Sequence, residues 1–238
     1  MMFGQNKPRP AVEGRDVQVH EVFYTLQGEG PFAGHPAVFV RVSGCNLRCW
    51  FCDTKWDDDN DATFTPEEVV DLVDYKNQNS VAKLVVLTGG EPLRHDLSEL
   101  ITLLSQRGYH VQIETSGSIW NRCVQLPGVT TVISPKTKVN KKFYDQDIGD
   151  GNYMSLAWKY VLADEQMPFD APTQRMPDGK TIGAAPPAPP PLGALVYMQA
   201  IDEQDEAKNK ANLIWVSQLC LENGFIFSVQ THKLAGLR

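Results

Sequence analysis

The sequence is poor in cysteine, with five residues among 238, and three of these five fall within eight positions. Thiols distributed in this way do not make a disulfide framework, so we expect free cysteines. A cluster of thiolates needs a reducing compartment, because oxidation would destroy it. We therefore expect a cytoplasmic protein, and we interpret Cys123 and Cys220 as ordinary buried thiols.

The sequence also lacks a long apolar run and an excess of basic residues. No run approaches the length of a membrane span, and the first twenty residues contain five charged residues and no apolar signal region. Lysine and arginine number 22 against 29 acidic residues, which gives a net charge of −7. Binding to nucleic acid over a broad face needs a basic surface. We expect neither a membrane nor a nucleic acid as partner.

The length fits a single domain with one insertion. We expect residues 1–16 to form a flexible tail and residues 17–238 to form the domain. Residues 164–191 end in a proline-rich stretch, which excludes helix and sheet and favours extended polyproline II. We expect an exposed insertion there. A docking segment for a partner is the alternative, because linkers and docking segments share this composition.

Cys45, Cys49 and Cys52 follow an apolar run typical of a strand. If their segment is a loop, the three thiols converge on one point. Structural zinc sites usually have four protein ligands, and no second cysteine or histidine pair follows at the usual spacing. A zinc site completed by His232 or Cys123 remains the alternative. Three thiolates suit a 4Fe–4S cluster instead, because they leave one iron open to an added ligand.

Strand-like and helix-like segments alternate along the chain, which predicts an α/β fold with a parallel sheet. Capping boxes predict helices that begin after Thr65 and after Asp96, and Gly224 is expected to end a third helix over residues 202–223. Within the first strand, Val17 and Thr25 have the same parity and should share a face. The predicted strands cover residues 17–26, 37–42, 83–87, 110–114, 129–133, 157–163, 194–199 and 225–230.

Polar motifs follow five of these strands, at residues 27–30, 45–54, 88–91, 114–117 and 134–136. Functional loops of parallel βα folds lie at the carboxyl ends of the strands, so we expect the five motifs to share one rim. Taken alone, the first motif can be a simple turn. Arg41, inside the second strand, can pair with a carboxylate or point to solvent from an edge strand.

The CxxxCxxC spacing, with Phe51 before the last cysteine, resembles the cluster motif of the radical S-adenosylmethionine (SAM) superfamily. In that superfamily SAM binds the open iron through its amino and carboxylate groups, and reductive cleavage yields a 5′-deoxyadenosyl radical. The resemblance implies a partial, modified TIM-like βα barrel of the radical SAM type.

Five motifs in order resemble those of the 7-carboxy-7-deazaguanine synthase family: residues 26–30, 52–54, 88–92, 134–136 and 230–233. Enzymes of this family are carbon–nitrogen lyases of queuosine and deazapurine biosynthesis. They convert 6-carboxy-5,6,7,8-tetrahydropterin to 7-carboxy-7-deazaguanine with release of ammonia. The resemblance implies a 4Fe–4S cluster, SAM, Mg²⁺, a reducing electron donor such as flavodoxin, and a homodimer.

The resemblance assigns a role to each motif residue by position. Cys45, Cys49 and Cys52 are expected to hold the cluster, and Thr54 is expected to bind Mg²⁺ through its hydroxyl oxygen. On its own, Thr54 can equally cap the turn. The residues expected to contact SAM are Phe51, Cys52, Asp53, Gly90, Glu91, Ser134, Pro135, Lys136, Gln199, Ala200, Ile201 and Asp202. Those expected to contact the pterin are Leu26, Gln27, Gly28, Arg41, Thr88 and Arg238.

Three features depart from the family pattern: the last residue is Arg238, the motif at residues 199–202 matches loosely, and the proline-rich insertion has no counterpart. Two other functions stay open. An activating enzyme of a glycyl-radical protein uses the same cysteine spacing but should lack the Gln27 loop and the Arg41 pairing. A zinc-binding interaction module with a proline-rich docking segment would hold zinc rather than iron with sulfide.

Overall fold

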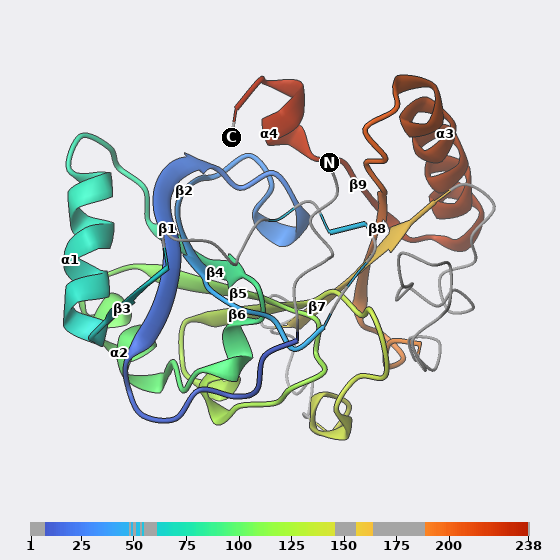
Figure 1. The fold of residues 1–238 in the computed structure, drawn as a ribbon. Helices are drawn as coiled ribbons and strands as arrows, with labels where there is room; N and C mark the ends of the chain where they lie inside the picture. The colour runs from blue at the N-terminus through green and yellow to red at the C-terminus, as the bar shows by residue number, and fades with distance from the viewer. Residues whose placement is uncertain are drawn as a thin grey trace.

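The fold is built on one nine-stranded sheet, in the order β3-β1-β2-β4-β5-β6-β7-β8-β9. A computed structural model describes residues 8–47, 49, 51–52, 54, 61–145, 156–163 and 189–237. Strands β2 and β4 to β9 are parallel, whereas β1 runs antiparallel to both of its neighbours. The mostly parallel α/β fold predicted from the sequence is therefore confirmed (Figure 1).

Eight of the nine strands overlap segments that the sequence predicts. The strands are β1 Val17–Leu26, β2 Pro36–Val42, β3 Ala62–Phe64, β4 Leu84–Gly89, β5 His110–Thr115, β6 Val129–Ile133, β7 Leu156–Leu162, β8 Leu195–Ala200 and β9 Ile226–Ser228. The unpredicted strand is β3, which is too short to show a pattern and pairs with the start of β1.

Helices α1, α2 and α3 flank the sheet, and α4 lies near the chain terminus (Figure 1). Helix α1 packs on β1 and β2, α2 on β5, and α3 on β8 and β9. None of the described helices is long and apolar enough to cross a membrane. The α-helices are α1 Pro66–Asn77, α2 Ser98–Gln106, α3 Glu206–Asn223 and α4 Thr231–Leu234, and the short 3₁₀ helices are η1 Gly30–Phe32, η2 Pro92–Arg94, η3 Arg122–Gln125 and η4 Lys141–Phe143.

The predicted helix ends are right at Thr65 and Gly224 and wrong at Asp96 and residue 202. The capping box of α1 forms, with the Thr65 hydroxyl accepting from the Glu68 amide. The box predicted at Asp96 is wrong, because that carboxylate bonds the amide and hydroxyl of Ser98 and α2 begins one residue later than predicted. Helix α3 begins at Glu206 instead of residue 202, and Gly224 ends it with a φ of 71° as predicted.

A β-bulge in β1 divides its side chains between two faces. The register shifts between Val19 and Glu21, so residues of equal parity before and after the bulge point in opposite directions. Val17 packs in the large core shared with the helices, whereas Thr25 lines the cavity described below. The prediction that Val17, Val19, Phe23 and Thr25 share one face is therefore wrong, because alternation alone does not reveal a bulge.

The inner face of the sheet is apolar at one end and polar at the other. Phe39 and Val86 form a small core with Ala37 and Leu84, and Phe32 of η1 packs against it. The Phe32 ring also meets the His110 ring edge-on at 5.1 Å between centroids. Toward the carboxyl ends of the parallel strands the inward side chains become polar. The inner face is therefore apolar near the amino ends of the parallel strands and polar near their carboxyl ends.

The segment from residue 27 to residue 35 reaches the polar end of the inner face from the apolar end. Because β1 is antiparallel to β2, with Leu26 opposite Pro36, its carboxyl end lies beside the amino ends of the parallel strands. The segment then folds back inside the sheet, where the Gly30 amide lies 3.5 Å from the Ser228 hydroxyl. The prediction that all five motifs share one rim is wrong for residues 27–30, because periodicity does not reveal strand direction.

Candidate active site

A cavity of about 280 Å³ lies between the three cysteines and the polar part of the inner face. It contains residues from loops that are far apart in sequence. The residues with a predicted role that line it are Leu26, Gln27, Arg41, Cys45, Cys49, Phe51, Cys52, Thr54, Thr88, Gly90, Ser134, Lys136, Gln199, Ala200, Ile201 and Asp202. The structure therefore brings together in one cavity most of the residues that the sequence singled out.

Five other predicted residues are not among the lining residues. Gly28, Glu91 and Pro135 are each next in sequence to a lining residue but do not line the cavity themselves. Asp53 and Arg238 lie outside the described residues, as does nearly all of the predicted insertion, from residue 164 to residue 188. Their predicted roles stay predictions.

The three cysteines that line the cavity are free, partly buried thiols. The Leu47 amide lies 3.4 Å from Cys45 Sγ, and Cys52 Sγ lies 3.4 Å from the carbonyl oxygen of Thr54. Burial raises the pKa of Cys49 to about 12, and burial together with the Glu91 carboxylate raises the pKa of Cys45 well above its usual range. Such thiols are poor nucleophiles, and they become thiolates when a metal centre displaces their protons.

The donor set fits an iron–sulfur cluster. It offers three thiols from one loop to a cavity with room for further ligands. Among the residues that the structure describes, no three His, Cys, Asp or Glu side chains are grouped so that they could hold a single metal ion. Cys123 is completely buried in the large core, away from the cavity, so it is wrong as a fourth zinc ligand. His232 does line the cavity.

Arg41 points into the cavity from β2. Its Nε donates to Glu21 Oε1 at 2.7 Å, and its guanidinium carbon lies 5.5 Å from the centre of the Phe23 ring. A second nitrogen donates to the Thr54 hydroxyl at 3.1 Å. The predicted carboxylate partner is therefore Glu21 of the neighbouring strand, brought opposite Arg41 by the bulge. The alternative, an arginine that points to solvent, is wrong.

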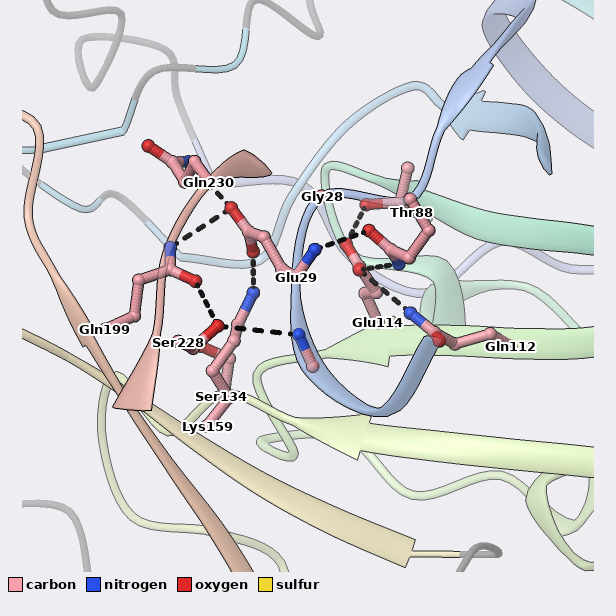
Figure 2. A network of polar contacts seen from close by, with 12 residues as sticks. Gly28, Glu29, Thr88, Gln112, Glu114, Ser134, Lys159, Gln199, Ser228 and Gln230 are labelled. Atoms are coloured by element: carbon pink, nitrogen blue, oxygen red, sulfur yellow. Dashed lines mark hydrogen bonds and ion pairs between the residues drawn. The ribbon is translucent and has the colours of Figure 1, made fainter. Parts of the chain in front are cut away.

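Glu114 is the first of two carboxylates that organise the polar wall, and it accepts three hydrogen bonds (Figure 2). The side-chain amides of Gln27 and Gln112 donate to its Oε1 at 2.9 and 3.0 Å. The Thr88 hydroxyl donates to its Oε2 at 3.0 Å. Glu114 belongs to one of the predicted strand-end motifs, but no role was predicted for it. Its inward parity on β5 was the available signal.

Glu29 is the second carboxylate, and it joins the segment of residues 27–35 to β7, β8 and the region near the chain terminus (Figure 2). It pairs with Lys159 and accepts from the amides of Gln199 at 3.1 Å and Gln230 at 2.6 Å. Burial opposes its ionisation, but the Lys159 charge and these hydrogen bonds outweigh burial and lower the pKa of Glu29 to about 2. The sequence gave no sign of this pairing.

Close backbone packing holds the segment of residues 27–35 against α4. The Thr231 amide donates to the Gly28 carbonyl oxygen at 3.1 Å. A Cβ at Gly28 would lie 1.7 Å from His232 Nδ1, so only glycine fits while His232 faces the cavity. Gly28 is thus needed for the shape of this wall.

Lys136 stands between the cysteine loop and β6. Its Nζ donates to the Ser134 carbonyl oxygen at 2.9 Å and lies 5.9 Å from the centre of the Phe51 ring. Burial lowers the pKa of Lys136 to about 8, against the opposing effect of Cys49. The side chain therefore brings a cationic group close to the thiols in a site with little water.

Glu91 braces two loops behind the cavity. Its carboxylate accepts from the Leu93 amide, the Thr115 hydroxyl, and both the amide and hydroxyl of Ser116. Beside it, a Cβ at Gly90 would lie 1.9 Å from the Gly44 carbonyl oxygen, so the chain can approach the cysteine loop only at a glycine. The hydrogen bonds of Glu91 and the close contact at Gly90 thus hold the end of β4 next to the cysteine loop.

Comparison with known proteins agrees with this geometry. Residues 39–126 match the family model of the radical SAM superfamily. The chain is 38% identical to the 7-carboxy-7-deazaguanine synthase of Rhodospirillum rubrum, with 98% of each chain covered. It is 30% identical to that of Escherichia coli K12, with 90% of this chain and 96% of the relative covered.

A solved structure extends the similarity to the fold. The crystal structure of QueE from Escherichia coli matches with a TM-score of 0.63 and 25% identity over 91% of this chain and 95% of that chain. The sheet is therefore the incomplete βα barrel of the radical SAM type. The chain belongs to the 7-carboxy-7-deazaguanine synthase family of the radical SAM superfamily.

Proposed function

We propose that this chain converts 6-carboxy-5,6,7,8-tetrahydropterin to 7-carboxy-7-deazaguanine with release of ammonia, as a radical SAM lyase of queuosine and deazapurine biosynthesis. One observation carries the proposal: three thiols and a wall with the polar side chains of Gln27, Arg41 and Glu114 line the same cavity. The relatives that bear the name of this activity align with almost the whole chain.

The cysteine wall would hold the 4Fe–4S cluster through Cys45, Cys49 and Cys52. When bound there, the cluster supplies an electron that cleaves SAM to a 5′-deoxyadenosyl radical. The chain's own part is to hold the SAM end groups and to keep water out. For this we propose Phe51, Cys52, Asp53, Gly90, Glu91, Ser134, Pro135, Lys136 and residues 199–202, with Glu91 acting through the loops that it braces.

The polar wall would bind the pterin. Arg41 would hold the 6-carboxylate, because a guanidinium forms strong hydrogen bonds with a carboxylate in a partly buried site. Glu114 would accept from ring N–H groups, and the amide oxygen and N–H groups of Gln27 can match a ring that carries both donors and acceptors. Leu26, Gly28, Thr88 and the terminal Arg238 complete the proposed contacts.

Position is the chief contribution of these residues. A carbon radical reacts with any nearby C–H bond, so a rigid cavity must present the correct carbon. Glu29 serves this end indirectly, because its amide donates to the Gln27 side-chain oxygen at 3.1 Å while its carboxylate is clamped by Lys159. The Gln27 amide group is thereby held toward Glu114.

Thr54 would supply one oxygen to Mg²⁺, with the substrate supplying others. A hard cation prefers oxygen ligands and retains several exchangeable positions, which suits a single hydroxyl in an open cavity. The Thr54 hydroxyl lies 3.1 Å from Arg41. Arg41 would therefore hold the substrate carboxylate close to the hydroxyl oxygen that we propose for Mg²⁺.

We also infer a homodimer, a cytoplasmic location and a reducing partner such as flavodoxin. These inferences rest on the family resemblance of the motifs. Light scattering of the anaerobic protein tests the first. Reduction of the cluster by purified flavodoxin, compared with dithionite, tests the last.

The direct test is anaerobic incubation of the reconstituted protein with SAM, reductant, Mg²⁺ and the carboxypterin. We expect 7-carboxy-7-deazaguanine and ammonia in equal amounts, with SAM used in catalytic quantity. Cleavage of SAM without this product would contradict the proposal and favour the activating-enzyme alternative. Zinc in place of iron and sulfide would favour the interaction module.

A further inference from the structure

The chain entering the cysteine loop makes a run of hydrogen bonds through its carbonyl oxygens. The carbonyl oxygens of four successive residues, from Val42 to Cys45, each accept one. The donors are the Gly90 amide at 3.1 Å, Arg94 at 2.9 Å, the Glu91 amide at 2.9 Å and the Arg9 amide at 2.7 Å. The path of the main chain into Cys45 is therefore strongly constrained.

Two of these four donors belong to one assembly, formed by Arg94 and the segment from residue 9 to residue 12. Arg94 is 3% exposed, and its NH1 donates to the Ser43 carbonyl oxygen. Its Nε donates to the Pro10 carbonyl oxygen at 2.7 Å, and its own carbonyl oxygen accepts from the Val12 amide at 2.7 Å. Residues expected to be a flexible tail are therefore tied to the cysteine loop.

The space between Gly44 and the Arg94 side chain is too small for a side chain at residue 44. Gly44 has a φ of 75°, and a Cβ there would lie 2.4 Å from Arg94 NH1. The same Cβ would lie 3.0 Å from the guanidinium carbon of Arg94, so the guanidinium and the loop backbone are in close contact. Lysine carries the same charge but offers donors from a single atom, so it cannot serve the Ser43 and Pro10 carbonyls in the same way.

We propose that Arg94 is a positioning residue: through Ser43 and the segment from Pro10 to Val12 it fixes Cys45, and with it the place from which the cluster and SAM face the substrate. This inference rests on the proposed function, because it assumes that the cysteine loop carries the cluster. It predicts that loosening Arg94 misplaces the reactive end of SAM relative to the pterin. Reaction steps that need only the cluster should suffer less than those that need its alignment.

The test uses the full-length chain, reconstituted anaerobically, with Arg94→Gln, Arg94→Lys and Val12→Pro. Val12→Pro removes the amide that donates to the Arg94 carbonyl and leaves the barrel untouched. Arg107→Gln is the matched control, because Arg107 pairs with Asp74 on the surface. Three quantities are measured: iron and sulfide per chain, the rate of iron loss to a chelator, and 5′-deoxyadenosine formed per deazaguanine.

We expect Arg94→Gln to lose iron about tenfold faster than the parent, as loss of two hydrogen bonds implies, and to release more 5′-deoxyadenosine per product. Arg94→Lys and Val12→Pro should lie between it and the parent, and Arg107→Gln should match the parent. If Arg94→Gln does not fold, Arg94→Lys and Val12→Pro decide the outcome alone.

Two results overturn the inference and are distinguishable from failure of the proposed function. If the variants melt at lower temperature but keep the parent's chelation rate and product ratio, Arg94 only stabilises the fold. Unchanged behaviour in all three variants also overturns it. If the parent itself takes up no iron and sulfide, the proposed function fails instead.

Discussion

The two walls of the cavity are built by different means. The cysteine wall is a loop, positioned from behind through main-chain carbonyls that bond Arg94, Gly90, Glu91 and the N-terminal segment. The polar wall is made of inward side chains of the strands and of the segment from residue 27 to residue 35, positioned by two partly buried carboxylates, Glu114 and Glu29. The difference suits the tasks that we propose for the two walls. A metal loop must hold its backbone, whereas a wall that binds a planar ring must hold its side chains.

If the walls act separately, each can be damaged while the other keeps its ligand. Cys49→Ser should remove the cluster and abolish product formation, because a hydroxyl is a poor iron ligand. Carboxypterin binding should change by no more than about twofold, as expected for independent sites. Iron analysis and equilibrium dialysis measure the two effects, and Cys220→Ser is the control. Loss of pterin binding together with the cluster would show that the walls are coupled.

Damage to the centre of the polar wall should have the next largest effect. Glu114→Gln keeps the size of the side chain but places an amide against the donors Gln27, Gln112 and Thr88. Loss of hydrogen bonds to a charged group predicts a fall in kcat/KM of about 100-fold. Iron and sulfide per chain should stay at the parent level, and Glu99→Gln on the surface of α2 is the matched control. A large loss of iron would contradict the division between walls.

Arg41→Gln sharpens the comparison at the point where the walls meet. Removal of the guanidinium should raise KM for the carboxypterin about tenfold or more, because a charge-assisted hydrogen bond to the carboxylate is lost. A pterin without the carboxylate should bind the variant and the parent equally. The measurement is KM for both compounds at saturating SAM. Equal losses for the two compounds would place the carboxylate elsewhere.

The smallest expected effect is on stability in acid. The pKa of Glu29 is lowered from 4.5 to about 2 in the folded chain. Its ionisation therefore stabilises the fold above about pH 4.5, and this contribution, on the order of 3 kcal/mol, is lost as pH falls toward 2. The free energy of unfolding of Glu29→Gln, measured in urea, should depend less on pH in this window. If the free energy of unfolding of the variant depends on pH as steeply as that of the parent, Glu29 is not the carboxylate whose pKa is lowered in the fold.

The sequence predicted the features that local patterns specify. The β-branched runs of the strands, the Thr65 cap and the Gly224 stop each depend on a few neighbouring residues, and all are present. The cysteine motif is an equally local pattern, because its three cysteines fall within eight positions. This motif gave the cofactor and the superfamily, and four further motifs in order were needed to give the family.

The remaining features depend on contacts between distant residues. Glu29 and Lys159 are 130 positions apart, and no spacing rule joins them. The antiparallel direction of β1 and its bulge follow from pairing with β2, so the rim predicted for residues 27–30 and the shared face of Val17 and Thr25 were wrong. Arg94 gave no signal at all, because its partners are carbonyl groups that any sequence supplies.

The central claim is that one cavity holds the cluster and the pterin together. Electron–nuclear double resonance of the reduced cluster, recorded with SAM and ring-deuterated carboxypterin, tests it directly. The account predicts a deuterium coupling to the cluster spin in the parent protein, and its loss in Arg41→Gln at the same pterin concentration. A parent protein that binds the pterin by dialysis yet shows no coupling would contradict it.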